Sequence, residues 1–139
     1  MEQHLYRDGT YSADMDDLKG LTLTAAYKND DDNELVFETD EWKFTFFHDQ
    51  DCCEHVYIES IVGDLQDLIG CPLEVAEEVT HQGVARSHNN KELEDWADED
   101  SCTWTFYKFA TRKGWVDVRW LGSSNGYYSE SVELKAEKK

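Results

Sequence analysis

The chain has few basic residues, a single proline and no long apolar run. Its 139 residues include only 13 lysines and arginines against 31 aspartates and glutamates, which gives a formal net charge of −18. Because phosphate contacts require Lys and Arg, we expect no nonspecific binding to nucleic acid or to an anionic membrane. No segment approaches the roughly 20 consecutive apolar residues of a transmembrane helix. A basic partner is the natural complement of such a chain.

Recognisable catalytic and targeting signals are also missing. The sequence has no glycine-rich phosphate loop, no Gly-x-Ser-x-Gly and no His-Glu-x-x-His, which favours a protein that is not an enzyme and needs no cofactor. Residues 1–4 have neither a basic nor an apolar character, so we predict no secretory signal, a cytoplasmic location and reduced thiols. The 13% aromatic content argues against a disordered acidic tail.

The acidic excess is confined to the first three-quarters of the chain. Residues 1–107 hold 27 acidic and 6 basic side chains, a net charge of −21, whereas residues 108–139 hold 4 acidic and 7 basic ones, a net charge of +3. We therefore expect a basic partner to avoid the C-terminal strands. An aromatic anchor among carboxylates is a reasonable binding feature. The alternative is a tryptophan that folds back and packs onto the core. The partner-binding residues predicted on this basis are Glu92, Glu94, Asp95, Trp96, Asp98, Glu99 and Asp100.

Apolar residues alternate with polar ones along most of the chain, which is the period of β-strands. The pattern predicts strands at 21–27, 34–39, 42–48 and 54–61, an extended segment after Pro72, and helical turns at 16–20 and 63–70. A β-meander is predicted at 103–111, 115–121 and 127–134, with a turn at 122–126, and Val116, Val118 and Trp120 facing inward. A long polar loop is predicted at 81–100.

These elements predict an α+β, mainly β fold. We expect an antiparallel twisted sheet, or a small barrel or sandwich, of about seven or eight strands with one or two short helices. Residues 1–15 show no period and are predicted to be a flexible arm. Residues 16–139 are predicted to form a single globular domain, because a chain of this length has no room for two ordinary cores.

Two short stretches carry groups that bind small ligands in other proteins. His48, Cys52, Cys53 and His55 are weak candidates for a metal site, but their spacing matches no zinc signature, so we predict no metal. The small and aromatic residues Ser124, Asn125, Tyr127 and Tyr128 are an alternative ligand-binding turn. The simpler interpretation of the second stretch is a hairpin turn whose tyrosines pack on the sheet.

Several short motifs resemble a family of small uncharacterised proteins encoded mainly by tailed bacteriophages and by some bacteria. The motifs are Asp51-Cys52-Cys53-Glu54, Gly63-Asp64-Leu65-Gln66-Asp67-Leu68-Ile69-Gly70 and Ser124-Asn125-Gly126-Tyr127-Tyr128-Ser129. The resemblance extends over roughly residues 16–135. It implies a phage or prophage origin and expression in the cytoplasm of the bacterial host cell, and it implies no activity or catalytic residue.

Two functional hypotheses follow. The first is an acidic accessory protein of a phage that binds and inhibits a basic host protein, either a nucleic-acid-binding protein or an antiviral-defence factor. Mimicry of nucleic acid is one way in which it would do so. Same-face residues of a strand repeat every ~6.7 Å, within a factor of two of the ~3.4 Å charge spacing of one DNA strand. The alternative is a module that sequesters a small ligand, a nucleotide or a metal. An anionic ligand would require Lys108, Arg112, Lys113 and Arg119 to line its pocket.

Overall fold

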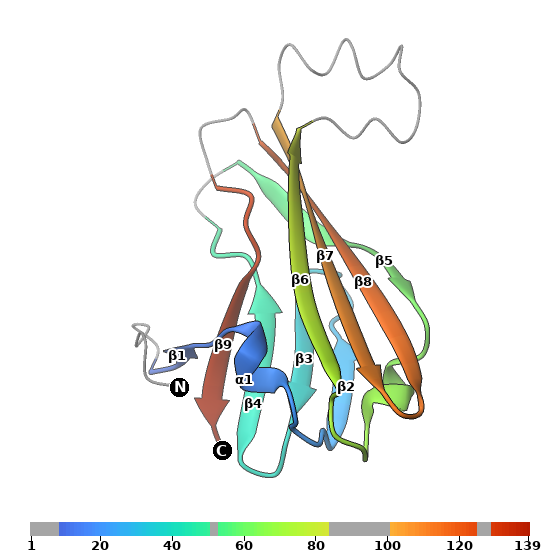
Figure 1. The fold of residues 1–139 in the computed structure, drawn as a ribbon. Coiled ribbons are helices and arrows are strands. Elements are labelled where there is room, and N and C mark those ends of the chain that lie inside the picture. The colour runs from blue at the N-terminus through green and yellow to red at the C-terminus, as the bar shows by residue number, and fades with distance from the viewer. Residues whose placement is uncertain (1–8, 51–52, 84–100, 125–128) are drawn as a thin grey trace.

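The structure, a computed structural model, describes residues 9–50, 53–83, 101–124 and 129–139. Within them, nine strands form two antiparallel sheets that pack face to face (Figure 1). The strand order is β1-β9-β4-β3-β2 in the first sheet and β5-β8-β7-β6 in the second. The prediction of a mainly β fold is therefore confirmed, and of the predicted architectures the molecule adopts the sandwich.

Most elements lie where the alternation predicted them. The five-stranded sheet comprises β1 (Tyr11–Ser12), β2 (Ala25–Lys28), β3 (Leu35–Glu38), β4 (Trp42–Phe47) and β9 (Glu133–Lys138). The four-stranded sheet comprises β5 (His55–Val62), β6 (Val75–Gly83), β7 (Ser101–Thr111) and β8 (Gly114–Ser124). The two helical turns are α1 (Met15–Leu18) and the 3₁₀ helix η1 (Leu65–Leu68).

The two helical turns begin at aspartates whose side chains cap them. Asp14 accepts a hydrogen bond from the Asp17 amide, and the Asp17 carboxylate accepts one from the Asp14 amide. The Asp64 side chain likewise accepts from the Gln66 amide. Such caps satisfy amides that the first helical turn leaves without a partner, so short polar residues determine where α1 and η1 begin.

The core lies between the two sheets and is rich in aromatic side chains. Phe37 and Phe46 come from the five-stranded sheet, and Phe109 comes from β7 of the other sheet. The Phe37 and Phe109 ring centroids lie 4.8 Å apart, and those of Phe46 and Phe109 lie 5.7 Å apart, in edge-to-face geometry. Val116, Val118 and Trp120 of β8 are all buried, which confirms their predicted inward direction.

Two predicted boundaries and one predicted strand pairing are wrong. β6 continues to Gly83 and β8 to Ser124, although loops were predicted from residues 81 and 122. The third strand of the predicted meander is β9, which pairs with β4 and β1 and not with β8. Gly122 explains part of the error, because a Cβ at this position would lie 2.8 Å from the Glu130 carbonyl oxygen. Gly122 therefore allows the segment that contains Glu130 to pack closely against β8, and it does not mark a turn.

The N-terminal part of the described chain joins the first sheet. Tyr11 and Ser12, which lie in the segment predicted as an arm, pair with Ala136 and Lys135 of β9. No helix among the described residues is long and apolar enough to cross a membrane.

Candidate functional site: the outer face of the four-stranded sheet

The outer face of the four-stranded sheet exposes several large apolar side chains. Alternate residues of a strand point to opposite faces, so the residues between the buried ones of β7 and β8 face outward. The exposed fractions are 64% for Val62, 61% for Val79, 40% for Phe106 and 58% for Trp115. Apolar residues gathered on one exposed face, more than single scattered ones, indicate an interaction surface.

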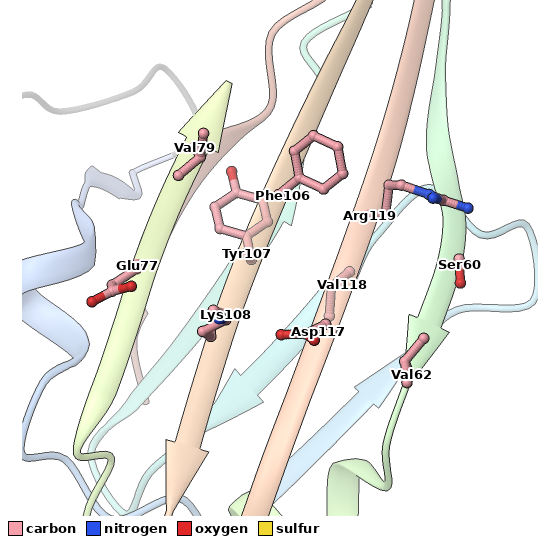
Figure 2. A pocket seen from close by; sticks show the side chains of 10 residues that line it. All are labelled: Ser60, Val62, Glu77, Val79, Phe106, Tyr107, Lys108, Asp117, Val118 and Arg119. Atoms are coloured by element: carbon pink, nitrogen blue, oxygen red, sulfur yellow. The ribbon is translucent and has the colours of Figure 1, made fainter. Parts of the chain in front are cut away.

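Strand register places these residues in ordered rows across the sheet. One row contains Val79, Phe106, Arg119 and Ser60, in the strand order β6, β7, β8, β5. The next row contains Glu77, Lys108, Asp117 and Val62. Figure 2 shows these side chains along the four strands, where they line a groove of about 540 Å³. That volume is in the range of ligand and side-chain binding sites.

The two cations of the groove are held by neighbouring groups. Arg119 Nη2 lies 2.5 Å from Glu59 Oε1, and the Arg119 guanidinium carbon lies 5.2 Å from the centre of the Trp104 ring. Lys108 Nζ lies 5.3 Å from the centre of the Trp115 ring. The cross-strand neighbours of Lys108 are the acids Glu77 and Asp117. The groove is therefore nearly neutral and apolar, which favours protein side chains over a phosphate group as its occupant.

An acidic hollow adjoins this groove at the β6 edge. Asp14 and Asp16 of the α1 region face Glu77 and Glu78 of β6 across a hollow of about 500 Å³. The other residues that line it are Met15, Ala76 and Val79, so no lysine or arginine is among the described residues around it. Glu77 and Val79 line both the hollow and the groove. The surface consequently changes from apolar to acidic across the single strand β6.

Tyr107 connects β6 to the interior. Its hydroxyl donates a hydrogen bond to Glu78 Oε2 over 2.6 Å. Burial raises the pKa of Tyr107 well above its usual range, and the nearby Glu78 carboxylate raises it further. The phenol therefore stays protonated, and it holds the Glu78 side chain on the side of β6 that faces α1.

A second polar cluster is buried where β5 begins. His48 Nε2 lies 2.7 Å from Glu54 Oε2, and His48 Nδ1 lies 2.7 Å from the carbonyl oxygen of Ser131. Nearby along β7 and β8, the Glu130 carboxylate accepts hydrogen bonds from the hydroxyls of Thr103 and Ser124. Both ring nitrogens of His48 and both oxygens of Glu130 thus have partners inside the protein. We assign this cluster a structural role.

Two of the residues proposed for a metal site, His48 and His55, line the same hollow beside the start of β5. His48 is buried, whereas His55 is exposed at the start of β5 and stacks on Tyr57 with the ring centroids 4.6 Å apart. No group of three or more His, Cys, Asp or Glu among the described residues is arranged to hold a metal ion. Ser124 is buried and donates to Glu130. Cys52, Asn125, Tyr127 and Tyr128 lie outside the described residues.

The predicted partner-binding residues also lie outside the described ranges. They are Glu92, Glu94, Asp95, Trp96, Asp98, Glu99 and Asp100, all within residues 84–100. Cys71 and Cys102 are buried thiols, whereas Cys53 is disulfide-bonded, so the expectation of reduced thiols is wrong for Cys53. That expectation depended on the predicted cytoplasmic location.

Sequence reasoning missed the groove, although a signal for it was present. In β7, Trp104 and Phe106 alternate with Tyr107 and Phe109, so both faces of the strand carry aromatic residues. A strand with one solvated face normally shows polar residues on that face. Aromatic residues on both faces of a strand near the surface therefore indicate a second apolar contact.

The structure defines a β-sandwich whose four-stranded sheet exposes apolar side chains on its outer face. The chain belongs to a family described as a domain of unknown function, DUF7448, whose model matches residues 10–134. No curated protein and no solved structure shows a significant match to the chain.

Proposed function

We propose that this protein is a non-enzymatic binding protein whose partner is a basic protein. The observation that carries the proposal is the groove on the four-stranded sheet, where exposed apolar residues adjoin an acidic hollow. Interfaces commonly combine an apolar centre with a charged border. A partner that presents apolar side chains beside lysines or arginines complements this surface.

The charge of the chain supports a protein partner in preference to a nucleic acid. A net charge of −18 repels phosphate and attracts a basic surface over several ångströms. Inside the groove, Arg119 is engaged by Glu59, and Lys108 has acidic cross-strand neighbours. This arrangement weighs against the alternative of a sequestered nucleotide, for which Lys108 and Arg119 would be the phosphate ligands.

We extend the proposal to the biological setting that the motifs imply. The protein acts as a phage-encoded accessory protein in the host cytoplasm and inhibits a nucleic-acid-binding or defence protein of the host. In the five-stranded sheet, outward-facing Glu38 and Glu137 flank Lys43 in the strand register. The outer face of this sheet is therefore not continuously acidic. Any mimicry of nucleic acid depends instead on the acidic β6 edge and on the acidic connections between strands.

The test compares two exposed aromatic residues on opposite faces of the sandwich. Phe106 in the groove is 40% exposed, and Tyr27 on the five-stranded sheet is 41% exposed. Host lysate is passed over the immobilised protein at low salt, and the captured protein is identified and its affinity measured as salt rises. We expect Phe106→Ser to weaken binding by at least about tenfold, as for a central interface residue, and Tyr27→Ser to leave it unchanged.

Three outcomes would contradict the proposal. One is that no basic protein is retained at low salt. Another is that Phe106→Ser and Tyr27→Ser have equal effects on the affinity. The third is a stoichiometric nucleotide or metal in native mass spectrometry of the purified protein, which would favour the small-ligand alternative.

A further inference from the structure

β6 has an open backbone edge in the described part of the molecule. It is the last strand in the order β5-β8-β7-β6, and its described pairing is with β7 alone. The edge is nine residues long, from Val75 to Gly83. Residues 77–81 are all exposed. An unpaired edge of this length presents free amide and carbonyl groups that another strand can pair with.

The other edges of the two sheets are short or blocked. β1 has two residues, and β2 has four. β5 is long, but its register shifts between Ile58 and Ser60, which indicates a bulge. The Ile58 amide also donates to the carbonyl oxygen of Asp32, so the β2–β3 hairpin covers this part of the β5 edge. Bulges and covering loops are common means of protecting a sheet edge.

The surroundings of β6 have space for an added strand. α1 contacts β6, and the hollow of about 500 Å³ lies between them. A neighbouring strand would lie ~4.8 Å from β6. Its alternate side chains would point toward the groove beside Glu77 and Val79, or toward the side that carries Glu78 and α1.

The charge of β6 identifies the chemistry of the added strand. β6 contains Glu77 and Glu78 and no lysine or arginine, and Glu74 directly precedes it. Pairing β6 with the β6 of a second copy would bring these carboxylates together, and like charges on paired strands are destabilising. A strand with alternating basic and apolar residues instead places lysines beside the carboxylates and apolar side chains beside Val79.

We propose that β6 receives an extended, basic and apolar segment of the partner as a fifth strand of the β5-β8-β7-β6 sheet. The inference depends on the proposed function, because it names how that basic partner is recognised. Main-chain hydrogen bonds to β6 hold the segment in register. The acidic residues at the β6 edge select its lysines or arginines, and the groove accepts its apolar side chains.

The probe is a capped heptapeptide of alternating valine and lysine. We expect it to bind the full chain and to protect backbone amides of β6 from hydrogen exchange by at least about tenfold, which NMR resolves residue by residue. Two further peptides carry N-methyl groups on alternate residues in the two possible frames. Because a strand pairs through the N–H groups of alternate residues, one frame loses binding and the other retains it. Equal binding by both frames would overturn strand addition.

Charge reversal provides the second readout. Glu77→Lys should weaken binding of the heptapeptide by roughly threefold to tenfold, in keeping with a desolvated interfacial charge contact. The matched control is Glu41→Lys in the exposed β3–β4 connection, which changes the net charge equally and should have little effect. Equal losses in the two variants would indicate attraction to net charge only and would overturn the inference.

The outcomes separate the two proposals. If a basic host protein is captured and Phe106→Ser releases it, but β6 amides gain no protection, strand addition fails and the proposed function stands. If neither host protein nor heptapeptide binds, the proposed function fails as well. Sedimentation that shows dimers lost in Val79→Lys would mean that a second copy occupies the edge, and it would overturn the inference.

Discussion

The two edge strands of the four-stranded sheet, β5 and β6, differ in how their edges are protected. β5 has a bulge and is hydrogen-bonded at Ile58 by the β2–β3 hairpin. The buried pair His48–Glu54 lies at the beginning of β5. Gly63, which packs against the backbone of Trp115 in β8, follows its end. β6 has no described strand on its outer side, and its protection consists of glutamates. In the proposed mode of binding, this charge would keep other acidic copies away from β6 and leave the edge open to a basic segment.

The largest effect is expected where β5 begins. The side chains of His48 and Glu54 are 4% and 0% exposed, and they form a pair at 2.7 Å. Glu54→Ala removes a hydrogen-bond partner of His48 Nε2 and of the Gln50 side-chain amide. Each polar group left unsatisfied costs about 1–3 kcal/mol, so the free energy of unfolding should fall by about 3 kcal/mol. Urea unfolding followed by tryptophan fluorescence measures this change.

Glu59 is the matched control for Glu54. It lies on β5 itself and pairs with Arg119 across to β8, but the side chains are 26% and 41% exposed. An exposed pair of this kind contributes about 1 kcal/mol or less. Equal losses of stability in Glu54→Ala and Glu59→Ala would contradict the view that a buried pair anchors β5.

The alternation of apolar residues was sufficient to predict most of these strands, because each one buries a single face in the core. The positions of β3, β4 and β5, and the caps at Asp14 and Asp64, depend on local sequence alone. The bulge in β5 and the pairing of β9 with β4 depend on contacts between distant segments. Local periodicity contains no information on such contacts.

The candidate site was less predictable than the fold. Exposed Val79 and Phe106 look like ordinary core residues of a strand, and only the register of four strands shows that they share an outer face. The acidic residues at 92–100 were predicted as a partner site because they are contiguous in the sequence. The acids of the β6 edge come from two separate segments, α1 and β6, and only the fold brings them together.

A smaller effect is expected at the end of β5. Gly63 has a φ of +105°, and a Cβ there would lie 2.4 Å from the carbonyl oxygen of Trp115. Gly63→Ala should therefore cost about 1–3 kcal/mol from backbone strain, with a further cost from the clash. Gly70→Ala is the control, because its φ is +88° and its nearest contact at 3.4 Å is the flexible end of Lys113. Equal melting temperatures for the two variants would show that the close contact of Gly63 with the backbone of Trp115 has no influence on stability.

The smallest effect at neutral pH is expected at β6. Tyr107→Phe removes one hydrogen bond to Glu78 and should cost about 1 kcal/mol. The pH dependence is more informative, because burial raises the pKa of Tyr107 in the folded protein well above its ordinary value of about 10. Its contribution to stability is therefore complete below about pH 10 and is lost as the pH rises further, at up to about 1.4 kcal/mol per pH unit.

Tyr27 provides the comparison for this alkaline transition. Its hydrogen bond to Glu38 raises its pKa to about 12, but the residue is exposed. Unfolding in urea, measured from pH 8 to pH 11, should show the steepest fall in stability for the natural chain. The fall should be shallower for Tyr107→Phe, and for Tyr27→Phe by no more than that, because both tyrosines stay mostly protonated in the folded protein up to about pH 11. If stability fell with pH at the same rate in the natural chain and in both variants, the buried Tyr107 hydroxyl would not be what positions the Glu78 side chain. The acidic edge of β6 would then be positioned by the strand backbone alone.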